Sequence, residues 1–513
     1  MKVTGLLSMK AKTNSAIEIL RHSRNIAKYS AAFQVVAIAI FLFFMSIYPA
    51  SHSNALFCGL VAIIISFLPV LYSLSQRNFE IIFSCISLFN LAPIWFLYLE
   101  AILPGYDAFE YSAPIYRVEA FFWIAIFQLF VNMIYYLFWK PASKRSVNIF
   151  SFLENISLSG DFFFKSSLLA FFVPLIVLIF HHGSLSNFWT VLVTGRADGN
   201  SGGLIPSSSD GRSSSYLMPF IWLWQLTPLF SSITFVSANR KLSLKSLFSV
   251  TLGIAVVFIF FLGGTRATMI FVAGPFLFFL FFYNWQRGWR FWSLAIVLFL
   301  STIAIMEFQV RFRNDSILEV LQDPAKAAKS KGLNASTTFD PTQSHRDNNM
   351  YLFCLLIKGY PEKYSFEGFG DFIANIVNPI PRSLWPNKPV LQGAKELIFQ
   401  YPFVLDGPLY MGTTSLTYSI VGEAYLSNGL WGLIVYAVVY SIFLLGFDGL
   451  TYFTKSKQPV AVGVLGISVF LAFWSYRAFF SLTSYIYPLL LLVLILRLVA
   501  YFAKTQVDHK TAI

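Results

Sequence analysis

Arginine is the residue type in this sequence that points most directly to chemistry. The run Phe260–Phe271, FFLGGTRATMIF, places Arg266 between two strongly apolar segments. Arg196 and Arg382 lie in long polar connections, and Arg477 lies in a short one. A guanidinium presents a flat fork of donors that pairs with phosphate or carboxylate oxygens and stays charged. Several arginines that converge at a membrane surface would therefore form a site for a phosphate or pyrophosphate head group.

Other residue types supply proton transfer and sugar contacts. His345 is of a type that titrates near neutral pH, and Glu423 stands at the start of an apolar run, so both are candidates for a general base. The stretch PRSLWPNKP, Pro381–Pro389, adds Trp385 and Lys388. The loops that carry these residues contain no clear D-x-D pattern, so we expect no metal ion at the site. We expect arginine, in place of a metal ion, to neutralise the charge of a pyrophosphate.

Each of these residues also has a structural explanation, which the sequence leaves open. Arg266 is typical of a span-end side chain that reaches the interface, and Arg196 is typical of a solvated loop charge. His345 fits an ordinary surface histidine, and Pro381–Pro389 fits a rigid linker. Glu423 fits a cap for the helix that it begins. Together these residues favour a functional site more strongly than any one of them does, because all of them are predicted on the same side of the membrane.

These residues must be positioned by membrane-spanning helices. Of the 513 residues 57% are hydrophobic and only 12% are charged, whereas soluble domains carry about 25% charged residues. Runs of about 20 apolar residues recur along the chain, which predicts an all-α, polytopic integral membrane protein. We predict twelve spans, at residues 30–48, 55–75, 79–103, 118–139, 162–182, 216–237, 244–262, 266–285, 291–309, 421–447, 459–476 and 482–502.

Charge decides the expected orientation of these spans. One side carries 21 of the 37 Lys and Arg residues but only six of the 24 acids, and both termini lie on it. Positive charge favours the cytoplasmic side, so both termini are expected in the cytoplasm. The net charge of +13 then reflects topology and attraction to membrane lipids, and no nucleic acid is expected as a partner.

The chain divides into three predicted parts. Residues 1–309 hold nine spans with short loops, residues 310–420 form a large outer loop, and residues 421–513 hold three spans and a cytoplasmic tail. A loop this long is usually functional or disordered. Its pieces Met350–Ile357 and Phe366–Val377 are apolar enough to be expected as short amphipathic helices in the membrane interface.

Three stretches carry a resemblance to a known family, the bacterial oligosaccharide repeat-unit polymerases of the Wzy type, which make O-antigen and capsule. Gly263–Arg266 resembles the family's turn of small residues followed by arginine. Pro381–Pro389 is similar to a P-R-x-x-[FW]-P-x-K-P stretch. Gly422–Gly432, GEAYLSNGLWG, looks like a signature built on Gly, Glu, Tyr, Asn and further glycines. The topology, with one large outer loop late in the chain, is also similar.

The resemblance implies a fold like that of the metal-independent, lipid-linked glycosyltransferases (GT-C-like). It implies the joining of polyprenyl-pyrophosphate-linked repeat units at the periplasmic face of the bacterial inner membrane, without a cofactor. A chain-length regulator of the polysaccharide co-polymerase type is the implied partner. In the related ligases two arginines and a histidine of the outer face serve the reaction, for which Arg196, Arg266 and His345 are the candidates here.

Three other functions compete with this one. An O-antigen ligase would use the same chemistry with a lipid A core as acceptor. A transporter or flippase of lipid-linked sugars would be expected to place ionisable residues mid-span, whereas here they lie at span ends, as Glu100 does. A structural scaffold would not require the proline-rich outer loop.

Overall fold

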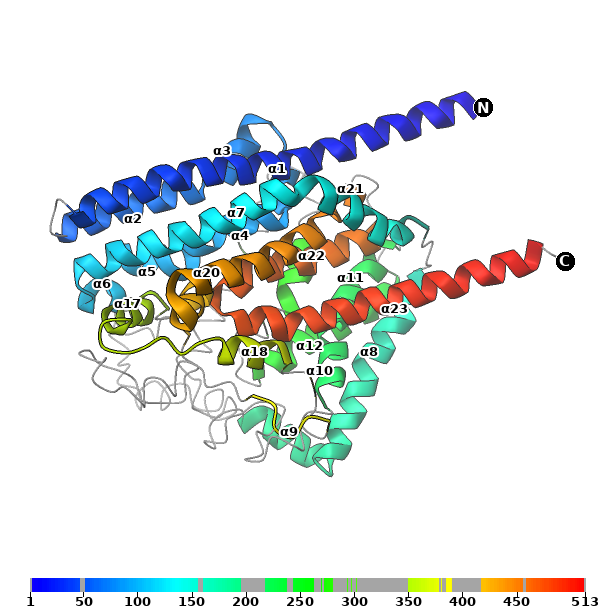
Figure 1. Ribbon diagram of the computed structural model, residues 1–513. Helices are drawn as coiled ribbons and strands as arrows, with labels where there is room; N and C mark the ends of the chain where they lie inside the picture. The colour runs from blue at the N-terminus through cyan, green and yellow to red at the C-terminus, as the bar shows by residue number, and fades with distance from the viewer. Residues whose placement is uncertain are drawn as a thin grey trace. The chain divides into compact units, whose positions relative to one another are not determined.

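The computed structural model of the protein describes the following residues: 2–46, 51–155, 160–194, 217–237, 243–262, 269, 272–279, 293, 297, 301, 349–377, 380, 384–389, 417–454 and 458–511. Among these residues the regular structure is helical throughout, without a strand (Figure 1). Nine of the described helices are long and apolar enough to cross a membrane, or ten if a pair bent by 40° is one span. The fold is therefore that of a polytopic helical membrane protein.

Ten of the twelve predicted spans match these helices. The agreement is closest for 244–262, which is the helix Leu244–Leu262, and for 459–476, which is Pro459–Arg477. The predicted spans 266–285 and 291–309 lie largely outside the described residues. A run of about 20 apolar residues thus coincides with a helix long enough to cross a membrane in each of these ten cases.

The structure differs from the predictions where a polar contact or a proline intervenes. The predicted span 55–75 is bent between His52–Ser66 and Leu68–Ser75, where Pro69 stands at the start of the second helix and cannot donate to the turn before it. The predicted span 118–139 continues as a helix from Pro114 to Phe150. Helix Asn349–Gly359, expected in the interface, is instead buried on nearly every face, as befits a helix that is apolar all round.

The chain forms two compact units, each assembled from segments distant in sequence. Unit 1 comprises Met1–Asn155, Arg346–Asn378 and Lys388–Ile486. Unit 2 comprises Ile156–His345, Pro379–Asn387 and Tyr487–Ile513.

Unit 1 is a bundle built around the long helices α1, α7 and α20, which lie side by side with α7 in the middle (Figure 1). Their bounds are Lys2–Ser46, Pro114–Phe150 and Ser419–Asp448. The other helices of the first 155 residues are α2 (His52–Ser66), α3 (Leu68–Ser75), the 3-10 helix η1 (Phe79–Phe83), α4 (Cys85–Pro93), the π-helix η2 (Ile94–Tyr98), α5 (Leu99–Ile102), α6 (Asp107–Tyr111) and the 3-10 helix η3 (Ser151–Asn155).

The later segments of unit 1 complete the bundle. They are α17 (Asn349–Gly359), α18 (Gly370–Val377), α21 (Thr451–Thr454), α22 (Pro459–Trp474), the 3-10 helix η8 (Ser475–Arg477) and the first residues of α23 (Phe479–Thr511). Because successive spans alternate in direction, the first residues of α2, α7, α20 and α23 share one end of the bundle. We call it the Glu423 end, and we call the opposite end, where α20 finishes, the Asp448 end.

Buried polar side chains connect the helices of unit 1. Asn90 of α4 and Asn132 of α7 exchange amide hydrogen bonds at 3.0 and 2.9 Å. Gln34 of α1 donates to Gln128 of α7. Within a membrane such pairs act as interhelical glue, because each amide would otherwise lack a partner. The mid-span polar groups are therefore satisfied by one another.

Unit 2 contains helices α8 (Gly160–His181), α9 (Leu185–Thr194), α10 (Met218–Gln225), α11 (Thr227–Ser237) and α12 (Leu244–Leu262). Helix α11 packs on both α8 and α12, around a core that includes Phe171, Trp224 and Phe260.

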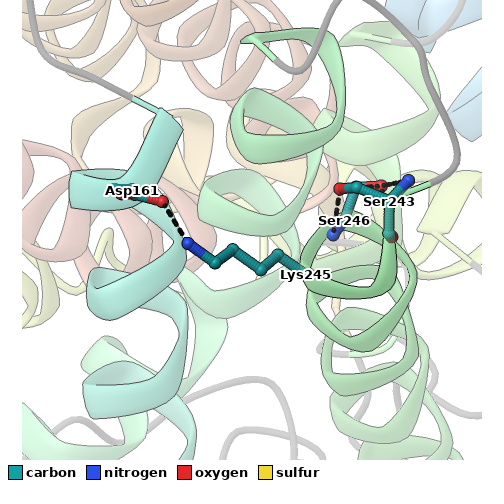
Figure 2. Close-up of polar contacts among 4 residues, drawn as sticks. All are labelled: Asp161, Ser243, Lys245 and Ser246. Atoms are coloured by element: carbon teal, nitrogen blue, oxygen red, sulfur yellow. Dashed lines mark hydrogen bonds and ion pairs between the residues drawn. The ribbon is translucent and has the colours of Figure 1, made fainter.

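Helix α12 begins with a reciprocal cap (Figure 2). The Ser246 N–H donates to the Ser243 hydroxyl at 3.2 Å, and the Ser243 N–H donates to the Ser246 hydroxyl at 3.1 Å. Lys245 pairs with Asp161 of α8 at 2.9 Å, and both side chains are more than 60% exposed. An exposed ion pair adds little to stability, so α8 and α12 are held together mainly by the packing of α11 on both and by the buried contact between the Ser167 and Ser249 hydroxyls at 2.9 Å.

Candidate functional site

The predicted site residues divide into those that the structure describes and those that it does not. Arg196, Arg266, His345 and Arg382 lie outside the described residues. The described ones are Glu423, Arg477, Trp385 and Lys388. Glu423 and Arg477 both lie at the Glu423 end of unit 1, so this end is the candidate functional site.

Helix α20 is interrupted within the stretch Gly422–Gly432. The backbone leaves helical geometry at Asn428 and Gly429, and Gly429 has φ 51° and ψ −128°. A positive φ of this kind suits glycine, which has no Cβ to clash with the backbone. At Gly432 an added Cβ would lie 1.8 Å from the Ala424 carbonyl oxygen, so the two pieces of α20 approach more closely than any side chain allows. The glycines of the stretch thus form a break in a spanning helix.

Part of the large loop packs against this break. The Glu367 N–H donates to the Leu426 carbonyl at 3.1 Å, directly before the interruption. The Tyr425 hydroxyl donates to the Tyr360 carbonyl at 2.8 Å, and the Phe366 ring lies edge-on to Tyr425 with centroids 5.6 Å apart. A carbonyl released by a helix break needs a new donor when it is buried. The loop segment supplies that donor and fixes the broken helix.

Glu423 stands in the first piece of α20, five residues before the break, and is half-buried. Its Oε2 accepts the backbone N–H of Phe479, the first residue of α23, at 3.0 Å. The first N–H groups of a helix have no partner inside the helix. The sequence leaves open that Glu423 caps its own helix, but its contact in the structure is with the N-terminus of α23.

Arg477 precedes Phe479 by two residues, in the 3-10 turn η8 between α22 and α23. It is half-buried, and its guanidinium lies 5.9 Å from the ring centroid of Trp474. The bond from Phe479 to Glu423 therefore brings the turn that carries Arg477 to the first piece of α20. This arrangement couples an anionic carboxylate, which can accept a proton, with a cation that can bind phosphate oxygens.

A second buried carboxylate lies at the same end. Glu100, only 3% exposed, follows the π-helix η2, a type of irregularity that is frequent at functional sites. Its Oε2 accepts the Met350 N–H at 2.7 Å, and its Oε1 accepts from Asn349 Nδ2 at 3.3 Å. A carboxylate is favourable at a helix N-terminus. Glu100 thus anchors α17, the first described helix of the large loop, to the bundle.

Arg117 is a residue of this end that sequence reasoning missed. It is fully buried, donates to the Ala101 carbonyl at 2.9 Å and lies 2.9 Å from His52 Nδ1, while its guanidinium faces Phe109 at 5.4 Å. The sequence contained a signal for this residue, because Arg117 is a lone arginine directly before the predicted span 118–139. It lies on the predicted outer side, where positive charge is not favoured. Its contacts hold α2, α5 and α7 together beside the site.

The remaining predicted residues are placed as follows. Trp385, in a turn assigned to unit 2, is 40% exposed, and Lys388, assigned to unit 1, is half-buried. An exposed tryptophan is suited to the predicted stacking on a sugar ring. Over the part of the chain that the structure describes, no group of three or more His, Cys, Asp or Glu side chains is arranged to hold a metal ion.

Neither a protein-family model, nor a curated protein, nor a solved structure matches this chain. A functional conclusion therefore rests on the chemistry of the residues and on their arrangement at the Glu423 end.

Proposed function

We propose that the protein is a membrane glycosyltransferase that joins polyprenyl-pyrophosphate-linked oligosaccharide repeat units into O-antigen or capsular polysaccharide. In this proposal the Glu423 end faces the periplasm of a bacterial inner membrane, and both termini lie in the cytoplasm. The observation that carries the proposal is the break in α20, which holds a half-buried carboxylate next to the turn of Arg477. Irregular backbone at membrane depth is tolerated where it is buried in protein or lines a cavity, and it often marks a binding site.

The reaction proposed is a single displacement at a sugar. A hydroxyl oxygen at the non-reducing end of a new lipid-linked repeat attacks the anomeric carbon of the growing chain. The bond from that carbon to the pyrophosphate oxygen breaks, and the polyprenyl pyrophosphate leaves with the electron pair. The hydroxyl proton passes to a base, for which His345 and Glu423 are the candidates. Each cycle lengthens the glycan by one repeat and releases one carrier.

The cations of the predicted outer side have the complementary role. Arg266 and Arg382, with Arg196 and Arg477, hold the donor pyrophosphate and stabilise the negative charge that develops as it leaves. Lys388 adds a further positive charge, and Trp385 stacks on sugar rings. No cofactor is required for this reaction, and a chain-length regulator is the proposed protein partner.

The test is made with the purified protein in detergent. Lipid-linked repeat units extracted from the native host are added, and the products are separated by size. Polymer of two or more repeats is expected, together with one equivalent of free polyprenyl pyrophosphate for each bond formed. Repeat units that stay single would contradict the proposal, provided that membranes of the wild-type host polymerise the same preparation.

Deletion of the gene in the native host distinguishes the ligase. Surface glycans that carry single repeats are expected for loss of a polymerase. Lipid-linked polymer that accumulates without attachment would indicate a ligase instead.

A transporter of lipid-linked sugars is the second candidate, and the interrupted α20 favours it, because broken helices are common at transport sites. Against it, the buried amides of Asn90 and Asn132 are paired with each other and do not form an open polar path. The detergent assay separates the two functions. A detergent micelle has no second compartment, so bond formation there cannot result from transport.

A further inference from the structure

An apolar groove lies between α1 and α3 in unit 1 and shares no residue with the candidate site. It encloses about 230 Å³ and is walled by Tyr29 and Phe33 of α1 and by Leu68 and Leu71 of α3. These walls remain open to the surroundings: Tyr29 is 43% exposed, Phe33 45% and Leu71 52%. In the 18-residue apolar segment that marks α1 as a candidate span, only 22% of the residues are buried in the protein. An apolar groove with exposed aromatic walls is suited to a lipid chain.

The groove is polar at the end nearer the start of α1. There the Tyr72 hydroxyl accepts from Asn25 Nδ2 at 3.0 Å and lies 3.0 Å from His22 Nδ1. Ser75 completes the lining at this end. The apolar stretch of α1, Leu20–Ser46, has 27 residues, or about 40 Å of helix, whereas a hydrocarbon core is about 30 Å thick. The first nine residues of this stretch carry three cations, Arg21, Arg24 and Lys28, and the rest carry none, so we place its first turns, with the polar end of the groove, at the head-group level.

Cations lie close in sequence to the residues of this polar end. Arg21 and Lys28 are exposed on α1, and Arg77 is exposed directly after α3. The acids nearest in sequence are Glu18 on α1, whose side chain is not described, and Glu80 in η1. Positive charge thus exceeds negative charge where a lipid head group would rest. A head group with a net negative charge is favoured over a zwitterionic one.

We propose that this groove binds one anionic glycerophospholipid of the surrounding leaflet. Its acyl chain lies between the aromatic wall of α1 and the leucines of α3. Its phosphate lies beside the Tyr72 hydroxyl, within reach of Arg21, Lys28 and Arg77. The bound lipid fills the groove beside the bend between α2 and α3. It packs against α3, which is the second half of the bent span.

Native mass spectrometry of the whole purified protein tests this site. Dioleoylphosphatidylglycerol and dioleoylphosphatidylcholine are titrated separately, and the fraction of protein with one bound lipid is measured. The anionic lipid is expected to bind at least about fivefold more tightly. Arg77→Gln is expected to weaken its binding about fivefold, because one cation near a membrane surface contributes about a factor of five. Equal affinity for the two lipids would overturn the proposal.

The location is tested by filling the groove. Leu71→Trp places a larger side chain on its wall and is expected to abolish the tight binding of one phosphatidylglycerol. The matched control is Ile64→Trp on α2, which is 61% exposed and outside the groove, and it is expected to bind as the wild type does. Wild-type binding by Leu71→Trp, with an unchanged melting temperature, would overturn the location.

Undecaprenyl phosphate, added as a competitor, tests the class of lipid. Displacement of phosphatidylglycerol by an equal concentration of undecaprenyl phosphate would assign the groove to the polyprenyl lipid and overturn the proposal.

Discussion

Glu423 on α20 accepts the backbone N–H of Phe479, so the first residue of α23 is fastened to the broken helix by a carboxylate 56 residues away in the chain. This bond gives Glu423 a structural role that is visible in the described contacts. It does not conflict with proton transfer, because one oxygen of a carboxylate can accept the N–H while the other faces a substrate. The two roles predict different results for a conservative substitution.

Glu423→Gln should separate these roles. The amide oxygen still accepts from Phe479, so the melting temperature in detergent is expected to stay within a few degrees of wild type. Glutamine cannot accept a proton at neutral pH, so polymer is expected to fall by at least about 100-fold, a typical contribution of a general base. Chain length is measured on a gel, and protein level by immunoblot.

The matched control for Glu423→Gln is Glu367→Gln. Glu367 accepts from the Tyr360 hydroxyl at 3.1 Å in the loop segment that packs against the same break. Its substitution should leave polymer close to wild type. If Glu423→Gln makes polymer of normal length and amount, the carboxylate is a structural anchor and not a base.

Arg266→Ala tests the predicted phosphate contact of a residue that lies outside the described part of the chain. Polymer is expected to be lost while membrane insertion stays intact, because the donor pyrophosphate loses a cation that stabilises its departure. Arg240→Ala removes a cation from the opposite predicted face and serves as the control. If Arg266→Ala makes normal polymer, Arg266 does not bind the donor pyrophosphate. Its role is then that of a side chain at the end of a span that reaches the membrane interface.

Sequence alone predicts the spans of this protein well and its polar contacts poorly. A span follows from local composition, as Leu244–Leu262 does, because burial in lipid requires only about 20 apolar residues in succession. The bond from Met350 to Glu100 joins residues 250 positions apart, and no local pattern encodes it. Asn349–Gly359 appeared interfacial because hydropathy cannot distinguish a helix buried in protein from one buried in lipid.

The candidate site was predictable only in part, for a similar reason. The composition of Gly422–Gly432 singled out this stretch, but the break at Gly429 depends on a backbone conformation that the sequence permits without requiring. Arg117 was overlooked because its burial depends on three helices meeting at their ends.

The glycines of α20 are expected to differ sharply in their tolerance of alanine. Gly432→Ala sets a methyl group against the Ala424 backbone oxygen and should prevent accumulation of folded protein. Gly429→Ala should cost about 1–3 kcal/mol of unfolding free energy, because φ 51° with ψ −128° is a conformation that residues with a side chain rarely adopt. Gly446→Ala is the control on the same helix, because its added Cβ meets nothing within 4 Å. Fluorescence-detected gel filtration ranks the three variants, and equal yields would contradict the observed break.

Cysteine labelling should report the burial of α17 and its dependence on pH. Cys58, Cys85 and Cys354 are all buried. Burial raises the pKa of the Cys354 thiol from 9.0 to about 12, so the native thiol stays protonated at pH 9 while an unfolded one ionises. Burial of this thiol therefore leaves the free energy of unfolding unchanged well below pH 9. The free energy of unfolding decreases as the pH rises above 9, because the unfolded state then releases the thiol proton and the native state does not.

N-ethylmaleimide is expected to label none of the three cysteines of the native protein between pH 7 and 9, and all three after denaturation. Ser53→Cys, at an exposed position, adds one site that should react at once and confirms that the reagent is active. Rapid labelling of native Cys354 at pH 8 would contradict the burial of α17.

Asp448 and Tyr135 are expected to be energetically coupled at the opposite end of unit 1. The Tyr135 hydroxyl donates to Asp448 Oδ2 at 2.6 Å, and Asp448 also accepts the backbone N–H of Cys85 at the start of α4. All of these groups are buried, so a donor or acceptor left without its partner costs about 1–3 kcal/mol. Asp448→Asn and Tyr135→Phe should each lower the unfolding free energy by that amount.

The double variant should lose less than the sum of the two single variants, by about 1 kcal/mol or more. Tyr135→Phe removes the donor and Asp448→Asn replaces one of the two acceptor oxygens with an amide NH2 group, so both substitutions act on the same contact. Tyr136→Phe provides the control cycle: the Tyr136 hydroxyl accepts from Arg24 at 3.3 Å and has no described contact with Asp448. Its loss should add to that of Asp448→Asn. Unfolding is followed in a denaturant titration of the detergent-solubilised protein. If the losses of Tyr135→Phe and Asp448→Asn simply add, the Tyr135 hydroxyl does not stabilise the Asp448 carboxylate. The N–H groups at the start of α4 would then be what stabilises this buried carboxylate.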